Sequence, residues 1–437
     1  MNSYDVIVIG GGMMGTACCY FLTQEGLKVA LIERGDIAGG TVSHTDGYIG
    51  ASEKEPGVDS IQGMESMKLY DQMRKTFDYD FEYSTSLTNP DEPCGFVYFC
   101  ESEFEMEMAQ KQVTANQAIG IEQYMISKEE VKELEPNSAT HILGGMWVPK
   151  DGAVAPYLVA FGFVYEAKKT GLLDVFTRTE VIGIKQNPAT KAVEGVITTK
   201  GDFKAPKVVN ACGVWGPFIG AMVGLDVPIE PRWGQLTVTE KTGPITQNRL
   251  CMEYGYFLTK FFKDGQGERP IPPLVKAYNV CLNITSDLTG NTVGGGCRLF
   301  KGYSIKNDFR VMQAVAQRMI NFFPVVKNYN CIRAFAGVRP FCLDQLPIVS
   351  DVEEVPGFYM ACGHEGDGIT LGPITGKLIS QYVTGKPLQF ELAPELAWAR
   401  FKDKDIDAIR KHEAANTTAL LKIEREVLER GSSSVNR

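Results

Sequence analysis

The sequence predicts an α/β protein, and three stretches near the N-terminus carry that prediction. Residues 4–9 (YDVIVI) form a short, apolar, β-branched run bounded by glycine, which is typical of a buried parallel strand. Residues 16–22 (TACCYFL) have the small and apolar side chains of a helix that packs on a sheet. Residues 28–32 (KVALI) predict a second strand, so the three stretches together predict a βαβ unit.

Three glycines at the first turn of this unit, Gly10, Gly12 and Gly15, fit the pattern G-x-G-x-x-G. They allow a tight turn, a close approach of a pyrophosphate to the backbone, and close packing of the helix on the strand. Glu33 ends the second strand, where its carboxylate can accept hydrogen bonds from ribose hydroxyls. The pattern predicts a Rossmann-like dinucleotide site rather than an unliganded glycine turn. FAD and NAD both fit at this point, because the pattern recognises the adenosine diphosphate half that they share.

Composition limits the remaining possibilities. A chain of 437 residues exceeds what one hydrophobic core usually supports, which favours two domains or a large insertion. The net charge of -9 provides no basic surface for nucleic acid. The 11 cysteines form no CxxC pair, which disfavours a disulfide framework or a zinc site and favours a reducing, cytoplasmic setting. We expect no membrane span, because no apolar run reaches bilayer length.

Four later segments carry a family resemblance. They are IAGGTVSHTDGYIG (37–50), KVVNACGVWGPFIG (207–220), AGVRPFCLDQLPIVS (336–350) and GFYMACGHEGDGITLGPITGKLIS (357–380). In this order and spacing the chain resembles the D-amino-acid oxidase and glycine oxidase (DAO) superfamily of flavoproteins. It is most similar to the bacterial dehydrogenase branch, which includes subunits of hydrogen cyanide synthase, opine oxidase and D-hydroxyproline dehydrogenase. The resemblance covers about residues 3 to 400.

The resemblance implies FAD as the cofactor and two domains that are discontinuous in sequence, so that the fold is α/β locally and α+β overall. The implied boundaries are residues 1–85, 145–228 and 335–390 for a Rossmann-like FAD-binding domain, residues 86–144 and 229–334 for a mainly antiparallel β substrate domain, and residues 391–437 for a C-terminal helical extension.

The residue patterns agree with this division. Residues 101–135 are charged and predict helix, whereas residues 235–240 and 275–285 have the alternation and β-branched content of strands. Residues 294–298 (GGGCR) are not followed by a helix, so we interpret them as a turn or a close backbone approach, and NAD is disfavoured. Residues 402–430 predict amphipathic helices that pack on the body or dock a partner subunit.

The resemblance implies oxidation of the Cα–N bond of a small amino acid, cyclic imino acid or N-substituted amino acid. Hydride passes from the α-carbon to flavin N5, and the resulting imine hydrolyses. This chemistry needs no metal and no protein nucleophile. The protein must instead hold the substrate carboxylate in one orientation and stabilise negative charge near flavin N1 and O2.

Three residues are the catalytic candidates. Arg339 matches the family's carboxylate-binding arginine, and its planar guanidinium can make paired hydrogen bonds; the alternative is a structural arginine at a strand end. Tyr256 lies near the position where the family has a tyrosine hydroxyl that contacts the same carboxylate, and Tyr254 is the other candidate for that role. For both tyrosines the alternative is packing in the hydrophobic core. His364 lines the flavin or holds its own loop, and we favour the structural role. Gly366 occupies the position of an arginine in glycine oxidases, which argues against glycine as the substrate.

The loops around the cofactor complete the set. We expect Gly40, Thr41 and Ser43 to approach the phosphates and ribityl chain of FAD, and His44 is a minor candidate for a covalent flavin link, as in dimethylglycine dehydrogenases. Residues 363–370 are expected to enter a helix near Pro373, whose N-terminus would polarise the flavin O2 and N1 edge. The remaining residues that the resemblance places at FAD are Arg34, Val181, Gly213, Gly363, Gly366, Gly368, Ile369 and Thr370.

The resemblance therefore implies an FAD-dependent amino acid dehydrogenase that passes electrons to a partner protein. The expected partners are an electron-accepting subunit or further copies of the chain in a homo-oligomer. Three alternatives stay open: an oxidase that uses dioxygen, a flavin-bearing electron-transfer subunit without its own substrate, and an enzyme that oxidises a hydroxy acid. Residues 261–275 are expected to form a lid or a plain surface loop near the substrate.

Overall fold

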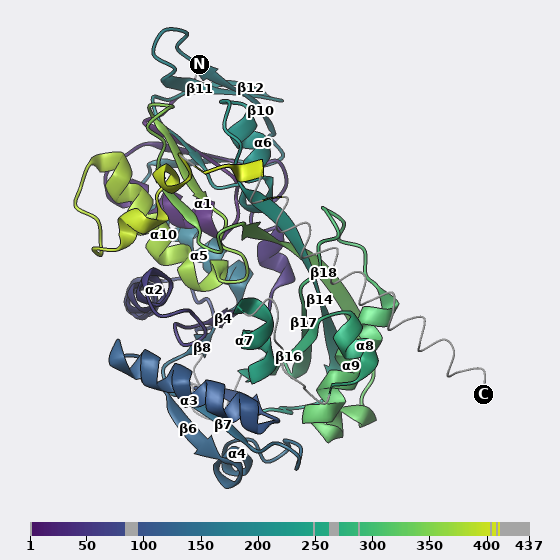
Figure 1. Cartoon of the computed structure of the whole chain (residues 1–437). Coiled ribbons are helices and arrows are strands. Elements are labelled where there is room, and N and C mark those ends of the chain that lie inside the picture. The colour runs from purple at the N-terminus through teal and green to yellow at the C-terminus, as the bar shows by residue number, and fades with distance from the viewer. Residues whose placement is uncertain are drawn as a thin grey trace.

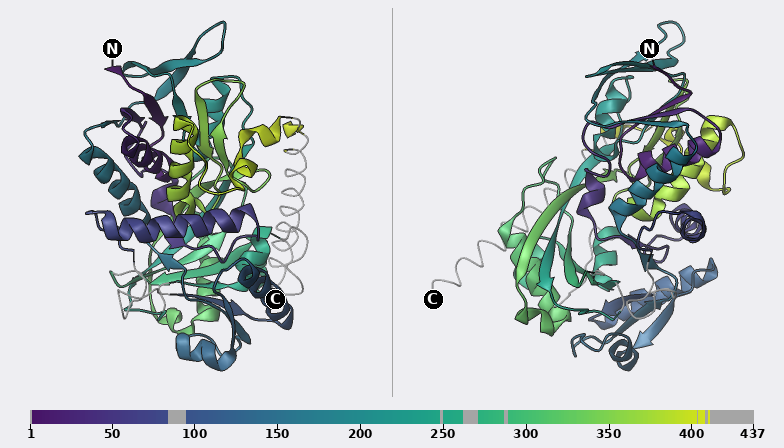
Figure 2. Two further views of the ribbon diagram at one scale, coloured as in Figure 1. Left: turned by 90° about the vertical axis from the view of Figure 1, so that its left-hand side faces the viewer. Right: turned by 180° about the vertical axis from the view of Figure 1, so that it is seen from behind.

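The structure is a computed structural model that describes residues 2–83, 95–247, 250–261, 271–286, 289–402, 404–407 and 410. Two large sheets, of six and eight strands, organise this part of the chain. Figure 1 shows them in different halves of the molecule, and both views of Figure 2 show the same division.

The six-stranded sheet has the strand order β19-β20-β13-β2-β3-β9. Its strands are β2 (Val6–Ile9), β3 (Val29–Ile32), β9 (Leu173–Phe176), β13 (Val208–Asn210), β19 (Ile348–Asp351) and β20 (Phe358–Cys362). All neighbours are parallel except the antiparallel pair β19 and β20. Helix α1 (Met13–Gln24) connects β2 to β3, which confirms the predicted βαβ unit.

Both faces of this sheet are covered, which explains why its strands are apolar throughout. Val6 and Val8 point to one face and pack in a core with α1, α5 (Pro156–Lys169) and α10 (Gly368–Thr384). Ile7 and Ile9 point to the other face, against a four-stranded sheet. That sheet has the order β1 (Asn2–Ser3), β12 (Gly201–Lys204), β11 (Val193–Thr198) and β10 (Val181–Gln186).

The eight-stranded sheet has the order β18-β14-β17-β16-β15-β5-β7-β6. Its strands are β5 (Phe96–Cys100), β6 (Tyr124–Ser127), β7 (Gly144–Val148), β14 (Ile229–Lys241), β15 (Leu250–Glu253), β16 (Val280–Ser286), β17 (Asn291–Cys297) and β18 (Cys331–Cys342). Its neighbours are antiparallel except β5 and β15. Helices α8 (Pro273–Ala277) and α9 (Phe309–Phe322) pack on one face, while α3 (Glu103–Ala118) and α7 (Tyr254–Phe261) lie on the other.

The other elements of the described part are short connections, apart from α2. They are β4 (Tyr48–Ile49), β8 (Gly152–Ala153), α2 (Val58–Thr76), α4 (Lys128–Leu134), α6 (Gly216–Ala221), and the 3-10 helices η1 (Thr41–His44), η2 (Gly213–Trp215), η3 (Pro324–Asn328), η4 (Ala393–Leu396) and η5 (Trp398–Phe401).

Three predicted segments differ in the structure. Residues 101–135 are not continuous helix, because β6 separates α3 from α4 and extends the sheet at β7. Residues 275–285 begin as α8 and become a strand only at Val280. Residues 294–297 of the GGGCR stretch lie in β17 rather than in a turn, and the expected close approach is present. A Cβ at Gly294 would lie 2.4 Å from the sulfur of Met319 on α9.

Sheet pairing also differs from the predicted boundaries at two places. Residues 145–148 and 335–342 were expected in the FAD-binding part, but they pair within the eight-stranded sheet as parts of β7 and β18. For residues 335–342 the reason is that β14 and β18 form one long antiparallel pair from Ile229 to Thr239, with a register shift only at Val238 and Thr239. Residues 145–148 pair with β5 and β6 instead.

The predicted C-terminal helical extension falls only partly in the described part. Residues 393–396 and 398–401 form 3-10 helices, and the remainder of the predicted amphipathic helices, residues 411–430, lies outside the described residues. The predicted lid also lies largely outside them, at residues 262–270. Among the helices of the described ranges, none combines the length and the apolar character that a bilayer crossing requires.

Candidate active site

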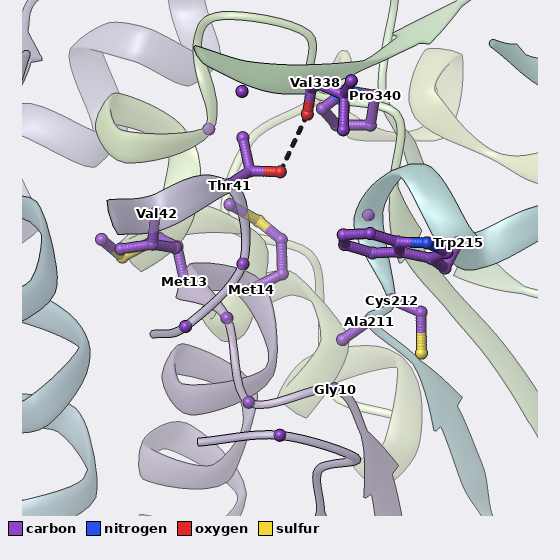
Figure 3. A pocket seen from close by; sticks show the side chains of 18 of the residues that line it. Gly10, Met13, Met14, Thr41, Val42, Ala211, Cys212, Trp215, Val338 and Pro340 are labelled. Carbon is purple, nitrogen blue, oxygen red and sulfur yellow. Dashed lines mark hydrogen bonds between the residues drawn. The ribbon is translucent and has the colours of Figure 1, made fainter. Parts of the chain in front are cut away.

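A cavity of about 900 Å³ opens where the carboxyl ends of β2, β3 and β13 meet. Ile9, Ile32 and Ala211, at or next to these strand ends, line it. Figure 3 shows the cavity wall formed by the start of α1, the η1 loop, Trp215 and residues of β18. Ligands bind at this edge in open parallel sheets, because the loops there leave a crevice.

The three predicted glycines have different environments. Gly10 has a φ of 106°, which L side chains rarely adopt, and a Cβ there would lie 2.6 Å from the carbonyl oxygen of Ala211. A Cβ at Gly15 would lie 1.8 Å from the carbonyl oxygen of Gly10, so this glycine packs helix against strand and does not line the cavity. Gly12 lines the cavity, and a Cβ there would meet only Val42, at 3.8 Å.

Glu33 lies at the end of β3, as predicted, and lines the cavity. Its carboxylate oxygens accept hydrogen bonds from the amides of Gly11 at 2.7 Å and Gly35 at 2.6 Å. Each carboxylate oxygen has two acceptor sites, so the side chain can still accept ribose hydroxyls. The neighbouring Arg34 also lines the cavity, with its guanidinium 4.3 Å from the ring centre of Trp215. This aromatic wall was not among the predicted site residues.

The second glycine loop approaches the cavity as the 3-10 helix η1. Gly40, Thr41 and His44 line the cavity, and the Thr41 hydroxyl donates to the carbonyl of Val338 at 2.9 Å (Figure 3). Nδ1 of His44 lies 2.8 Å from the carbonyl oxygen of Gly40. A covalent flavin link at His44 stays a prediction. Ser43 does not line the cavity, because its hydroxyl donates to the carbonyl of Ala38 at 2.5 Å.

The other predicted FAD residues divide in the same way. Val181, Gly213, Gly366, Gly368 and Ile369 line the cavity, whereas Gly363 and Thr370 do not. Gly363 has a φ of 90° and packs beside Cys342, so it shapes the turn after β20. The Thr370 hydroxyl is buried, and it accepts the amide of Gly50 at 3.2 Å.

Helix α10 begins at Gly368 rather than near Pro373, and Pro373 lies inside it. Proline lacks the N–H that would bond to the carbonyl of Ile369. That carbonyl instead accepts the Tyr70 hydroxyl of α2 at 2.6 Å. The neighbouring carbonyl of Thr370 accepts the Ser66 hydroxyl at 2.5 Å. Side chains of α2 therefore stabilise a helical turn that the local sequence predicts to be loop.

Arg339 lies on β18 and lines the cavity. Its guanidinium crosses Gly234 on β14, where a Cβ would lie 2.3 Å from Nη1, so the glycine provides the room that the side chain needs. Nη1 donates to the carbonyl of Cys297 at 3.0 Å, which is its one hydrogen bond within the described ranges. A guanidinium has five N–H donors, so donors remain for a carboxylate in the cavity.

Tyr256 lies close to this arginine but not on the cavity surface. It is buried on α7, and the Arg298 guanidinium lies 4.0 Å from its ring centre. Burial raises the pKa of Tyr256, while the positive charges of Arg298 and Arg339 act against that increase. The competitor Tyr254 is fully buried in a hydrophobic cluster, which is the core-packing role.

His364 combines the two roles considered for it. It lines the cavity, and its Nε2 lies 2.9 Å from the Thr375 hydroxyl of α10. Burial lowers the pKa of His364 to about 3, so the imidazole is neutral at ordinary pH. Its buried Nδ1 has no hydrogen-bond partner within the described ranges, which leaves a polar atom next to the cavity.

Buried charges behind the cavity were not predicted. Arg232 on β14 and Arg298 after β17 lie 3.3 and 3.5 Å from the carboxylate of Glu365. Lys54 is fully buried, with its Nζ 2.9 Å from Asp367. Only Glu365 and Asp367 had a sequence signal, since both lie in the GHEGDG loop. The partners come from distant segments, and no local pattern points to them.

The residues present fit FAD. The first-turn amides of α1 are not capped by a side chain, and the same is true of α10. Uncapped helix starts at a cavity are anion sites, because their N–H groups lack partners and the helix dipole is positive there. Residues at both starts, Gly12 and Gly368, line the cavity.

Comparisons with known proteins agree with FAD as the cofactor. The DAO family model, described as FAD dependent oxidoreductase, matches residues 5–382. Glycine oxidase of Geobacillus kaustophilus is 27% identical over 400 residues, which cover 90% of this chain and 96% of that protein. Hydrogen cyanide synthase subunit HcnC of Pseudomonas aeruginosa is 24% identical, covering 92% and 97%. The crystal structure of L-proline dehydrogenase from P.horikoshii has a TM-score of 0.78 at 23% identity, covering 92% and 98%. The chain therefore belongs to the DAO family of FAD-dependent oxidoreductases.

Proposed function

We propose that this enzyme oxidises the Cα–N bond of a small amino acid, a cyclic imino acid or an N-substituted amino acid, and passes the electrons to a protein acceptor. The observation that carries the proposal is Arg339. A guanidinium with donors to spare faces a cavity whose other end is built for a dinucleotide. A small carboxylate bound there would have its α-carbon held in one orientation.

Bound FAD supplies the hydride acceptor of the reaction. The chain's own residues contribute binding and orientation. Arg339 holds the carboxylate, and the uncapped amides at the start of α10 provide donors for negative charge that develops near them. His364 is neutral and therefore adds no competing positive charge at this wall. Met13 and Met14 contribute apolar side chains to the cavity wall.

The acceptor part of the proposal is supported by the relatives. The hydrogen cyanide synthase relative is named as a subunit, so at least one protein similar to this chain is part of a larger assembly. By analogy we infer a protein partner as the electron acceptor of this chain. Hydrogen peroxide release under air, at a rate equal to the rate of dye reduction, would contradict this part and favour the oxidase alternative.

The test is anaerobic mixing of the FAD-loaded enzyme with a panel of D-, L-, cyclic and N-alkyl amino acids and of hydroxy acids. The expected result is loss of the visible absorbance of oxidised flavin with at least one amino acid. If no member of the panel reduces the flavin, the proposed function fails. If hydroxy acids alone reduce it, the Cα–N assignment is wrong.

Arg339→Ala is the matched variant for this experiment. Loss of a charge-assisted pair with the carboxylate should weaken substrate binding by about 2–3 kcal/mol, roughly 30- to 150-fold in the half-saturating concentration. Arg339→Lys keeps the positive charge but loses the paired hydrogen bonds of the planar guanidinium. Its affinity for the substrate should lie between those of the unmodified enzyme and the alanine variant. Unchanged reduction in the alanine variant would show that Arg339 does not bind the substrate. Unchanged activity of the assembled complex, with no reduction by any amino acid, would support the flavin-bearing electron-transfer subunit, whose own pocket is not used.

A further inference from the structure

Glu365 brings a negative charge to the cavity next to Arg339. It lines the cavity and has a φ of 47°, a backbone conformation that is uncommon for residues other than glycine. Its amide donates to the carbonyl of Pro340 at 2.9 Å, and the adjacent His364 forms an isolated bridge with Phe341. The loop is therefore attached to β18 immediately beside Arg339, and this attachment holds the strained residue in place.

Two arginines fix the Glu365 carboxylate from behind. Nη1 of Arg232 lies 3.3 Å and Nε of Arg298 lies 3.5 Å from Oε1. The amide of Gly366 donates to Oε2 at 2.5 Å. Positive charges and an amide donor favour the ionised form of a carboxylate, so Glu365 is an anion that has few alternative orientations.

Gly366 leaves space beside Arg339. A Cβ at Gly366 would lie 3.7 Å from Nε of Arg339, so a longer side chain at this position would extend beside the Arg339 guanidinium. With glycine there, the cavity presents a cation and an anion on neighbouring backbone segments. The two charges match the carboxylate and the amine of an α-amino acid.

We propose that Glu365 determines substrate specificity by accepting a hydrogen bond from the substrate amine while Arg339 binds the carboxylate. The substrate class is then an amino or imino acid that carries at least one N–H. This inference rests on the proposed function of the same site, and it adds the group that recognises the nitrogen. Arg232 and Arg298 are positioning residues in this arrangement, because they act through Glu365.

The test compares two ligands that differ only at the amine. 2-Aminoisobutyrate and pivalate both lack an α-hydrogen, so neither can be oxidised, and pivalate has a methyl group in place of the amine. Dissociation constants are measured on the FAD-loaded enzyme from the change in flavin absorbance. The unmodified enzyme should bind 2-aminoisobutyrate more tightly than pivalate. In Glu365→Gln that preference should fall by about tenfold or more, and pivalate binding should not weaken, because the variant removes a negative charge near its carboxylate.

Two further variants separate recognition from a general structural effect. Glu354→Gln makes the same chemical change at an exposed turn residue and should leave both dissociation constants unchanged. Glu365→Asp keeps the charge but withdraws it by one methylene, and it should weaken 2-aminoisobutyrate alone. It also serves as the second variant if Glu365→Gln does not retain FAD.

Three results would overturn the inference: equal weakening of both ligands in Glu365→Gln, which would mean that Glu365 only positions Arg339; no change in either; or no preference for 2-aminoisobutyrate in the unmodified enzyme. Failure of the proposed function is distinguishable, because it appears as the absence of flavin reduction with every amino acid while the binding comparison can still be read.

Discussion

Gly10, Gly12 and Gly15 have three different roles within one turn. Gly10 has a backbone conformation that a side chain would strain, and Gly15 leaves space for the carbonyl oxygen of Gly10. Gly12 alone has room for a Cβ within the protein, and it lines the cavity. We therefore expect a side chain at this position to affect ligand binding and not the fold.

This difference gives a prediction for two alanine variants. Gly15→Ala should destabilise the FAD-free protein by about 1–3 kcal/mol, because the new methyl group collides with backbone. Gly12→Ala should leave the melting temperature of the FAD-free protein nearly unchanged but should weaken FAD binding. The measurements are thermal unfolding without FAD and titration with FAD. Equal destabilisation of the FAD-free protein by both variants would contradict the assignment.

For single residues, the local sequence predicted a position at the cavity correctly where that position depends only on the neighbouring residues in the chain. Glu33 and Arg339 lie at the cavity as predicted, because a strand end and a motif arginine are local features. Ser43 was expected at FAD, but its hydroxyl donates to the carbonyl of Ala38. The direction of this side chain depends on the conformation of η1. Lys54, Arg232 and Arg298 were not identified, since their partners are distant in the sequence.

Among the elements, α10 and the loop before it determine the chemistry of the cavity's far wall. The loop places His364 against Thr375 and removes it from water, which lowers its pKa to about 3. The helix starts early because two side chains of α2 donate hydrogen bonds to carbonyls of its first turn. Tyr70 donates to the carbonyl of Ile369, which Pro373 leaves without an amide donor, and Ser66 donates to the carbonyl of Thr370. Sequence patterns within the helix cannot show this, because the stabilising groups lie on another helix.

The buried His364 makes the stability depend on pH. An unfolded chain binds a proton on this imidazole below about pH 6.5, whereas the folded protein does so only near pH 3, so protonation favours unfolding within that window. Between pH 7 and pH 5 the FAD-saturated enzyme should therefore lose about 2 kcal/mol more stability than its His364→Asn variant. Urea unfolding at the two pH values measures the difference. An equal loss in both proteins would show that the imidazole titrates normally.

For the whole molecule, a buried polar network joins the two large parts of the structure. Asp151, between β7 and β8, accepts the Tyr48 hydroxyl at 2.7 Å and also the hydroxyl of Ser52. The Ser52 hydroxyl lies 3.2 Å from the Tyr98 hydroxyl on β5. The backbone carbonyl of Ser52 accepts hydrogen bonds from the side-chain amides of Gln112 and Asn116 of α3. Burial raises the pKa of Asp151. The network connects the loop after β4 to the eight-stranded sheet.

Breaking this network should loosen the connection between the two parts. Asp151→Asn removes an acceptor from a fully buried cluster and should cost about 3 kcal/mol or more, because donors are left without a partner. Tyr48→Phe removes one hydroxyl and should cost about 1–2 kcal/mol. Urea unfolding and limited proteolysis measure both variants. Asp151→Asn with an unchanged midpoint would mean that the network does not contribute to stability.

The sequence by itself determined the parts of this protein that depend on local rules. The βαβ unit, the glycine turn, the acidic end of β3 and the arginine of β18 follow from strand and helix periodicity, backbone conformation and spacing along the chain. The tertiary structure decided the extent of β14 and β18, the early start of α10 and the ion pairs around Glu365. These features form only when segments far apart in the chain pack together, because hydrogen-bond and charge partners stabilise them from outside each segment.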